Sequence, residues 1–334
     1  MRGMVTIDTS KYFRVVEDIG RMRIHSSTKA VFKALDILTS IVLEAEDVNT
    51  LVKYYPNLAS SLVKSRPASA LMSNIIRDFT LRINNLLQKG GLELAKDRVR
   101  EESKSLKDDI KRRNNTVAII ASRRISDGST IMTYSYSTVV KTAIVNAIDE
   151  GKYVKVYIPE SRPGSEGLEM AEELSEVGAD VTVFVDSATR YMMKDVDIVL
   201  ISSEAVAANG AVVNKVGTSL IALAANEARV RVFALAQTLK FYPGTFLGEL
   251  IELGRAEPRS FIREEVVEEL RGVEVYAPVF DVTPPEYIDA IVTERGLVAP
   301  QAVVFIIRDI YGWPPKIPSL DYELKRMRNI GGIA

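Results

Sequence analysis

The spacing of apolar residues divides the chain near residue 113. Before that point, apolar residues recur every three or four positions, as in Ala34, Leu38 and Ile41, which is the period of an amphipathic helix. No run of alternating β-branched residues interrupts this pattern, and the charged stretch 92–113 continues it. Residues 1–113 therefore predict a helical domain whose last helix is long and has a solvated face.

From Thr116 onward, short segments rich in valine and isoleucine alternate with helical stretches. Continuous apolar strands between helices are typical of a parallel sheet that is covered on both faces. Residues 114–315 therefore predict an α/β, Rossmann-like domain with a mainly parallel sheet flanked by helices. The predicted strands are 116–121, 130–134, 153–158, 180–185, 198–202 and 230–236, and the predicted helices are 137–150, 167–177, 187–194 and 219–226.

The last third of the chain has a less regular pattern. Asn209-Gly210 is a turn signal and predicts a small hairpin over 210–214. The closing segment 316–334 is polar, contains Gly-Gly near its end, and predicts a loose tail. Between them we expect a helical, acidic stretch at 241–270, strands at 275–280 and 288–293, and a helix at 301–310.

The composition excludes several kinds of site. The 334 residues include no cysteine and one histidine, His25, so we expect no disulfide, no thiolate nucleophile and no metal site. The formal net charge of −1 gives no electrostatic footprint for direct nucleic-acid binding. No signal peptide or membrane-spanning run is found, so we expect a cytoplasmic protein with no membrane partner. The motifs of dinucleotide and P-loop sites are missing, and no cofactor is expected.

Polar residues follow the predicted strands, and in α/β sheets ligands bind outside the carboxyl ends of the strands. Glu160-Ser161-Arg162-Pro163 follows one strand and opens a helix, so its backbone N–H groups and the Arg162 guanidinium would suit a phosphate. A plain strand-to-helix loop with a surface arginine would have the same pattern.

Two lysines give a second set of candidates. Asn214 and Lys215 come after the tight turn at Asn209-Gly210 and could hold hydroxyl groups and a phosphate. Lys240 lies just past the predicted strand 230–236 and could reach the same crevice. Solvated side chains on loops would account for these positions equally well.

Arg66 and Ser135 are weaker candidates. Arg66 precedes a predicted helix that Ser69 would cap and that would run to Leu87, so Arg66 could reach a phosphate at that helix start. A simple loop is an equal alternative. Ser135 could be a nucleophile, but no Gly-x-Ser-x-Gly turn surrounds it and no base other than His25 is at hand. A loop hydroxyl is therefore the favoured role for Ser135.

The stretch Ser-Ser-Glu-Ala-Val-Ala-Ala-Asn-Gly-Ala-Val-Val-Asn-Lys-Val-Gly-Thr at 202–218 resembles the active-site segment of one superfamily. That superfamily contains the alpha, beta and delta subunits of translation initiation factor 2B, archaeal ribose-1,5-bisphosphate isomerase and methylthioribose-1-phosphate isomerase. The resemblance implies a helical N-terminal domain, a Rossmann-like C-terminal domain, and dimers that can build hexamers. It extends to the segments 129–140, 158–167, 236–241 and 276–300.

Within this superfamily, the isomerases carry a Cys at the position of Ser135 and an Asp at the position of Glu204. They also carry an early Arg-Gly phosphate-binding pair, whereas the matching stretch 23–27 reads Arg-Ile-His-Ser-Ser here. A serine hydroxyl without a base is a poor substitute for a thiol at neutral pH. Glutamate carries its carboxylate one methylene further out, and a misplacement of roughly 1 Å can cost about a hundredfold in rate.

The resemblance to the alpha subunit, through Tyr136-Ser137 and Glu204, favours one interpretation. It is a non-catalytic, oligomeric factor of an archaeal, alpha-subunit-like branch, with a regulatory pocket for a phosphorylated sugar or nucleoside monophosphate and the alpha subunit of initiation factor 2 as its partner. Catalytic residues are then not expected, since Ser135 and Glu204 are degenerate. The implied ligand-binding residues are Arg66, Glu160, Arg162, Asn214, Lys215 and Lys240.

Two alternatives remain. One is a sugar-phosphate aldose–ketose isomerase of the ribose-1,5-bisphosphate type, acting in nucleoside monophosphate breakdown. The other is a catalytically silent partner that modulates another family member. The missing Cys separates the leading interpretation from the isomerase, and it predicts no appreciable turnover of either sugar phosphate.

Overall fold

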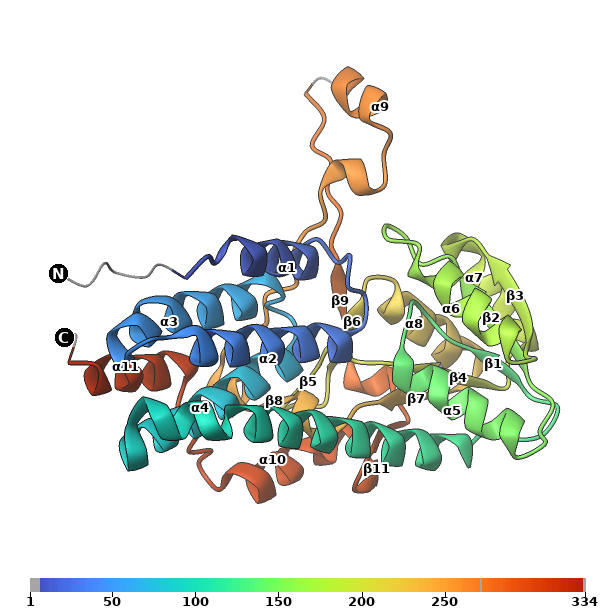
Figure 1. Cartoon of the computed structure of the whole chain (residues 1–334). Helices are drawn as coiled ribbons and strands as arrows, with labels where there is room; N and C mark the ends of the chain where they lie inside the picture. The colour runs from blue at the N-terminus through green and yellow to red at the C-terminus, as the bar shows by residue number, and fades with distance from the viewer. Residues whose placement is uncertain (1–6, 271, 333–334) are drawn as a thin grey trace. The chain divides into compact units, whose positions relative to one another are not determined.

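The computed structural model describes residues 7–270 and 272–332, which belong to two compact units (Figure 1). One unit takes the chain up to Lys111 together with the residues from Lys316 on. The other takes Arg112–Pro315. In the part of the chain that the structure describes, no helix combines the length and apolar character needed to cross a membrane.

The first unit is helical, as the three- and four-residue spacing predicts. The side chains of Ser26 and Asp47 start two of its helices by accepting the backbone N–H groups of Lys29 and Thr50. Gly90 and Gly91 interrupt the long fourth helix with non-helical backbone angles. The helices are α1 (Ser10–Gly20), α2 (Ser27–Glu44), α3 (Val48–Ser65), the first part of α4 (Ala70–Ser122) and α11 (Leu320–Ile330).

Ser69 directly precedes α4, but its buried hydroxyl has no hydrogen-bond partner among the described residues, so the predicted side-chain cap is wrong. The helix also continues beyond the predicted end at Leu87. The glycine pair at 90–91 is the local break that the sequence signals.

The closing segment is not the loose tail that its polar composition predicts. Residues 320–330 form α11, in which Leu324 and Met327 are buried. Asn84 donates hydrogen bonds of 2.8 Å to the carbonyl and to the carboxylate of Glu323. Two apolar residues spaced one turn apart are enough to fix a short, otherwise polar helix when a buried amide also holds it.

The second unit is the predicted α/β domain, and its main sheet has the order β11-β10-β7-β4-β1-β2-β3. Every neighbouring pair is parallel except β10 and β11. The strands are β1 (Thr130–Met132), β2 (Lys155–Pro159), β3 (Asp180–Phe184), β4 (Ile198–Ile201), β7 (Arg231–Leu235), β10 (Ala290–Thr293) and β11 (Gly296–Val298).

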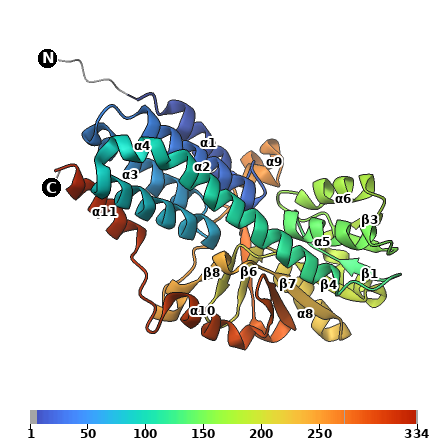
Figure 2. The same cartoon turned by 60° about the horizontal axis from the view of Figure 1, so that its bottom comes forward.

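Alternate strand residues face two separate hydrophobic clusters. Ile131 packs with buried residues from the end of α4 and from the helices at 138–149 and 166–176. Met132 packs with buried residues from the helices at 218–228 and 303–311. Figure 2 shows α5 and α6 on one side of the sheet, with α8 and α10 on the other. The helices of this unit are α5 (Thr138–Asp149), α6 (Glu166–Glu176), α7 (Thr189–Met192), α8 (Thr218–Ala228), α9 (Glu264–Glu269) and α10 (Val303–Tyr311).

The predicted strand 116–121 is instead the end of α4. Val117, Ala118 and Ala121 are buried in the core of the α/β unit, while Ile119 is 46% exposed. That burial has helical spacing, and a short apolar run cannot be assigned to helix or strand by periodicity alone.

A second, smaller sheet has the order β8-β5-β6-β9. The predicted hairpin is confirmed, since β5 and β6 pair in antiparallel fashion and Gly210 between them has a φ of 87°. The predicted strand 275–280 begins later, as β9. The strands are β5 (Ala205–Ala207), β6 (Val212–Lys215), β8 (Phe241–Tyr242) and β9 (Phe280–Thr283).

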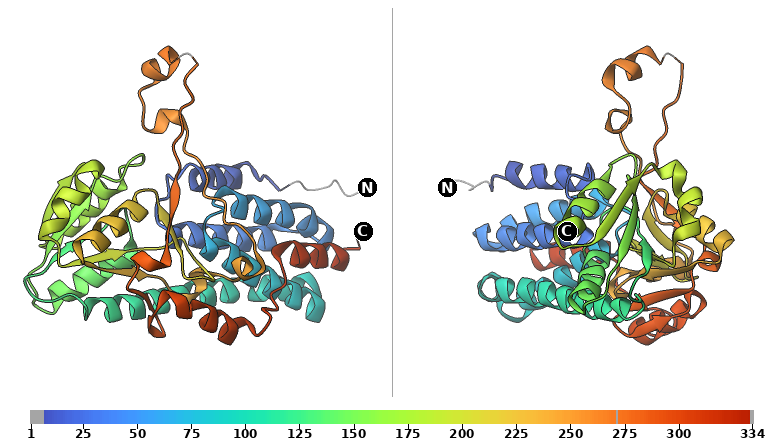
Figure 3. Two further views of the ribbon diagram at one scale, coloured as in Figure 1. Left: turned by 180° about the vertical axis from the view of Figure 1, so that it is seen from behind. Right: turned by 90° about the vertical axis from the view of Figure 1, so that its right-hand side faces the viewer.

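The stretch 241–270 is not one helix. It contains the 3-10 turns η4 (Pro243–Leu247) and η5 (Pro258–Ser260) and the short helix α9, joined by irregular segments. Figure 3 shows α9 at the end of an arm that projects from the α/β unit. Pro258 and the glycines at 244, 248 and 254 account for this difference. Proline and glycine are unfavourable inside a helix, even where the charge pattern suits one.

Candidate functional site

The strand order places a switch point between β1 and β4. From β1 the chain builds β2 and β3 on one side, and β4, β7 and β10 follow on the other. Ligands of such sheets bind in the crevice outside the carboxyl ends of the strands, at the point where the order reverses. Ser135 follows β1 and Glu204 follows β4, so the two positions that differ from the isomerase pattern flank this switch point.

The backbone at Ser135 is held in an unusual conformation. Its φ is 58°, in the left-handed region, and its N–H donates a 2.8 Å hydrogen bond to Ser161 Oγ. Ser161 also has a positive φ, of 67°, and its hydroxyl donates to the carbonyl of Pro159. Such conformations cost about 1–3 kcal/mol each and persist only where the surroundings fix them. The loops after β1 and β2 are therefore locked together.

Asp186 fixes the second of these loops. Its two carboxylate oxygens accept the backbone N–H groups of Ser161 at 2.8 Å and Arg162 at 2.7 Å. The Arg162 side chain is exposed and donates to the carbonyl of Phe261 in the arm at 2.6 Å. Glu160 is half-buried, and its N–H donates to the carbonyl of Phe184. The loop has the predicted position, while Arg162 reaches towards the arm in this conformation.

Lys215 forms a buried ion pair with Glu166 at the start of α6. The distance between Nζ and Oε1 is 2.6 Å, and the two side chains are 8% and 1% exposed. Removing one partner of such a pair would leave an uncompensated buried charge. Asn214 beside it is buried and donates to Thr218 Oγ1 at 3.0 Å. Lys215 therefore lies against the start of α6, directly after the loop that holds Arg162, whereas Asn214 is bonded to the start of α8.

Lys240 and Glu204 lie close together beyond the carboxyl ends of β7 and β4. Both side chains are buried, and Lys240 Nζ donates to the carbonyl of Ser203, next to Glu204. The Glu204 N–H donates to the carbonyl of Val213 at 2.7 Å, which continues the β5–β6 pairing. Glu204 is thus fixed between the main sheet and the small sheet.

Asp281 lies at the amino end of α8. One of its oxygens accepts the N–H groups of Gly217 at 2.7 Å and Ser219 at 3.1 Å. Burial raises the pKa of Asp281 to about 6, although these two hydrogen bonds act in the opposite direction. Tyr134 lies close by, because a Cβ at Gly217 would be 2.2 Å from its hydroxyl oxygen.

Three carboxylates lie near enough to Tyr134 to affect its pKa. Burial raises the pKa of its phenol well above the ordinary value, and the negative charges of Asp186, Asp281 and Glu166 raise it further. The phenol therefore stays protonated and can act only as a neutral hydrogen-bonding group. The sequence places Tyr134 and Asp186 at the ends of predicted strands and Glu166 in the predicted phosphate loop, but it gives none of them, nor Asp281, a role in ligand binding.

Several buried polar atoms around these strand ends lack hydrogen-bond partners within the described residues. Such atoms are usually satisfied by ordered water or by a bound molecule, and leaving one unsatisfied costs about 1–3 kcal/mol. Hydroxyl groups of a sugar would suit a set of this kind. The atoms include Thr133 Oγ1, Ser203 Oγ, Gln237 Oε1, Asp281 Oδ1 and Thr283 Oγ1.

Arg66 lies in the helical unit. It is buried and donates hydrogen bonds to the carbonyls of Ile24 at 3.1 Å and His25 at 3.0 Å. These bonds fix the loop before α2, and a role for Arg66 in phosphate binding stays a prediction. Over residues 7–270 and 272–332, no three His, Cys, Asp or Glu side chains are grouped as metal ligands would be.

Comparison with known proteins identifies the family. The model of the Initiation factor 2 subunit family matches residues 23–300. The chain belongs to this family. The predicted family membership is confirmed, as is the predicted fold class. The solved structure of translation initiation factor eIF-2B from Pyrococcus horikoshii superposes with a TM-score of 0.74 at 26% identity, covering 88% of this chain and 99% of that chain.

Curated relatives within the family point to catalysis. A ribose 1,5-bisphosphate isomerase of Methanocaldococcus jannaschii is 39% identical over 255 residues, which cover 76% of this chain and 80% of the relative. One of Pyrococcus furiosus is 35% identical over 306 residues, covering 90% and 94%. These relatives contradict our prediction of a non-catalytic factor subunit. That prediction gave two positions, Ser135 and Glu204, more weight than similarity spread along the whole chain.

Proposed function

We propose that this protein is a sugar-phosphate aldose–ketose isomerase of the ribose-1,5-bisphosphate type. The observation that carries the proposal is the similarity to curated isomerases, which reaches 39% identity and, in the Pyrococcus furiosus relative, 94% of that protein's length. The buried polar atoms and cations at the carboxyl ends of the strands support it.

The reaction requires a group that carries a proton between two neighbouring carbons of the opened sugar. We assign this role to the carboxylate of Glu204, a buried residue whose backbone is held beside the switch point. Triosephosphate isomerase shows that a glutamate can be the base of an aldose–ketose isomerisation. A thiolate is therefore not a chemical requirement, and a carboxylate one methylene longer than aspartate can act if the sugar is bound correspondingly further away.

Ser135 has a different role in this proposal. Its hydroxyl keeps its proton at neutral pH and so cannot act as a thiolate would. It can donate a hydrogen bond to a sugar oxygen, and the locked backbone between Ser135 and Ser161 would hold the donor in place. Such fixed donors stabilise the negative charge that develops on the oxygen as the proton leaves carbon.

Lys215 is our choice for a phosphate ligand. An ammonium group has three donors, and in Lys215 one of them is directed to Glu166. The remaining donors can bind a phosphate, and Glu166 then fixes the ammonium position without occupying it fully. Asn214, Lys240, Glu160 and Arg162 stay as predicted ligands of the sugar hydroxyls and of the phosphates.

The substrate of this proposal is a phosphorylated sugar, and no protein partner is needed for the chemistry. A homodimer or hexamer, a cytoplasmic location and contact with the alpha subunit of initiation factor 2 stay predictions.

The test is turnover of ribose-1,5-bisphosphate by the purified full chain, followed by phosphorus NMR. We expect the ketose bisphosphate to form at a rate of order one per second, within the usual range of enzymes. Methylthioribose-1-phosphate is the comparison substrate and should react far more slowly. No product with either substrate would overturn the proposal.

A further inference from the structure

A cavity lies at the amino ends of the strands of the main sheet, whereas the candidate site lies at their carboxyl ends. It has a volume of about 1020 Å³ and is lined by the first residues of several parallel strands. Ile198, Arg231 and Ala290 begin β4, β7 and β10, and Ser129 precedes β1. Its size is at the upper end of the usual range for small-molecule sites, about 300–1,000 Å³. The chemistry proposed above uses none of these residues.

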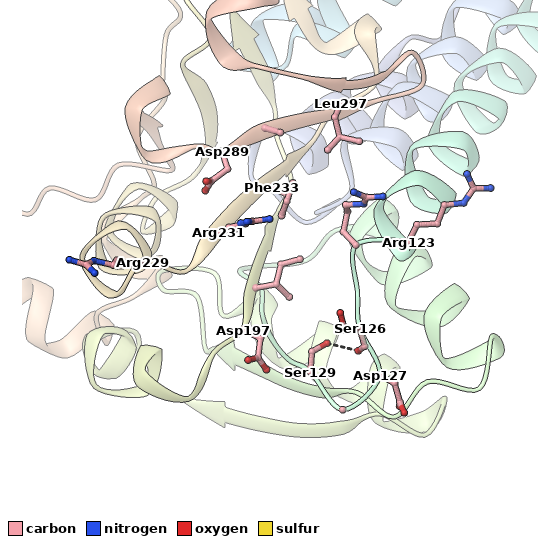
Figure 4. Close-up of a pocket in the computed structure, with 14 residues that line it drawn as sticks. Arg123, Ser126, Asp127, Ser129, Asp197, Arg229, Arg231, Phe233, Asp289 and Leu297 are labelled. Atoms are coloured by element: carbon pink, nitrogen blue, oxygen red, sulfur yellow. Dashed lines mark hydrogen bonds between the residues drawn. The ribbon is translucent and has the colours of Figure 1, made fainter.

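Four arginines line this cavity, and none of their guanidinium groups has a hydrogen-bond or ion-pair partner among the residues that the structure describes. Arg123 and Arg124 follow the end of α4. Arg229 ends α8 in a left-handed conformation, with a φ of 59°, and Arg231 is the first residue of β7. In Figure 4, Arg231 lies near Asp289 and Phe233, with Arg229 and Arg123 at opposite margins.

The three aspartates of the cavity have structural roles that account for their presence. Asp127 accepts the N–H of Tyr153, Asp197 accepts that of Thr130, and Asp289 accepts that of Val232, each at 2.8 Å. Each carboxylate therefore secures the start of a strand or a residue close to one. Across residues 7–270 and 272–332, the four arginine side chains have no comparable partner. A guanidinium group is most strongly bound by a planar or tetrahedral oxyanion.

The cavity also has an apolar part. Ile198, Phe233 and Ala290 are nearly buried, and Leu297 is 45% exposed. The arginines, by contrast, come from two separate segments of the chain, 123–124 and 229–231. One orthophosphate would engage only one or two of the guanidinium groups, whereas a linear chain of phosphates can reach both segments.

We propose that this cavity binds an anion carrying a chain of two or more phosphate groups. A nucleoside triphosphate and an inorganic oligophosphate share this chemistry, and the apolar part of the cavity would favour the nucleotide. The aspartates oppose an anion at short range, so the expected affinity is moderate and falls as salt screens the arginines.

The experiment is calorimetric titration of the full chain at low ionic strength with tripolyphosphate, ATP and orthophosphate. We expect tripolyphosphate and ATP to bind at least tenfold more tightly than orthophosphate. ATP binding more tightly than tripolyphosphate would identify a nucleotide site, and equal affinities would identify an oligophosphate site.

The variant R124Q/R231Q should weaken tripolyphosphate binding at least tenfold. Its matched control, K325Q/R328Q, also removes two exposed positive charges, from α11, and should bind as the wild type does. Both variants should keep the turnover of ribose-1,5-bisphosphate. Tripolyphosphate should still bind when the titration is repeated in the presence of saturating ribose-1,5-bisphosphate.

Three results would overturn the proposal. They are no binding of tripolyphosphate by the wild type, equal losses in the two double variants, and displacement of tripolyphosphate by the sugar bisphosphate. The last would place the anion at the carboxyl ends of the strands instead.

Discussion

Gly217, at the amino end of α8, meets two independent constraints. Its φ of 104° is one that side chains with a Cβ rarely adopt, and a Cβ would lie 2.2 Å from the Tyr134 hydroxyl oxygen. Its N–H also donates to Asp281. The residue therefore connects the conformation of the α8 start with the position of the Tyr134 phenol.

We expect Gly217→Ala to lower the free energy of unfolding by about 2–4 kcal/mol, because strain and a steric clash add. The matched control is Gly178→Ala, whose φ is 89° but whose Cβ would meet nothing within 4 Å. That variant should lose about 1 kcal/mol from strain alone. Urea unfolding compares the two, and equal losses would show that Tyr134 moves aside without cost.

Asp281 gives a dependence of stability on pH. Burial raises the pKa of this carboxyl from 3.8 to about 6, so the folded protein holds the proton more firmly than the unfolded chain. The stability that Asp281 contributes is fully present below about pH 4 and is lost as the pH rises to about 6. The variant Asp281→Asn cannot titrate and should not show this loss.

We therefore expect Asp281→Asn to gain stability relative to the wild type between pH 4 and pH 7, by roughly 1–3 kcal/mol. The measurement is the difference in unfolding free energy between the two proteins at each pH, in which the contributions of other groups cancel. A difference that does not change with pH would show that burial does not perturb this carboxyl.

Part of the candidate site could be predicted from single residues. Ser135, Glu160 and Glu204 follow predicted strands, and the rule for α/β sheets places such residues at one edge. The partner of Lys215 could not be predicted, because Glu166 is 49 residues away in the chain and the contact depends on where the small sheet meets α6. The same holds for Asp281, which acts on the start of α8 from another strand.

At the scale of elements, buried parallel strands were the most predictable part, since continuous Val- and Ile-rich runs between helices are typical of such strands. Residues 116–121 show the limit of that signal. They are apolar enough for a strand, but they continue a helix that began far upstream. Segment 241–270 shows the opposite error, since a helix was predicted and mostly irregular structure is found. Its charge pattern favours a helix, but its prolines and glycines prevent a continuous one.

The α11 helix tests how much a short polar element contributes. Met327 is fully buried in the helical unit, so Met327→Ala should cost about 2–4 kcal/mol of unfolding free energy. Lys325→Ala on the exposed face of the same helix is the matched control and should change stability by less than about 0.5 kcal/mol. Thermal unfolding followed by circular dichroism distinguishes them. A neutral Met327→Ala would mean that α11 is only loosely held.

At the scale of the whole molecule, fold and family are shown and the chemistry is proposed. The helical unit and the doubly wound sheet match what the family implies, and the switch point between β1 and β4 gives the site its place. The two substituted positions suggested a protein without activity, whereas similarity along the chain favours an isomerase. Turnover of the sugar bisphosphate tests the proposed chemistry directly.

The decisive experiment compares wild type, Glu204→Gln and Ser135→Ala in turnover of ribose-1,5-bisphosphate. We predict that the wild type is active, that Glu204→Gln lowers kcat by about 10²–10⁴-fold with little change in KM, and that Ser135→Ala has a smaller effect. The glutamine keeps the size of the side chain and removes only its ability to carry the proton. A wild type without turnover, or a Glu204→Gln variant with wild-type kcat, would contradict the proposed isomerase mechanism.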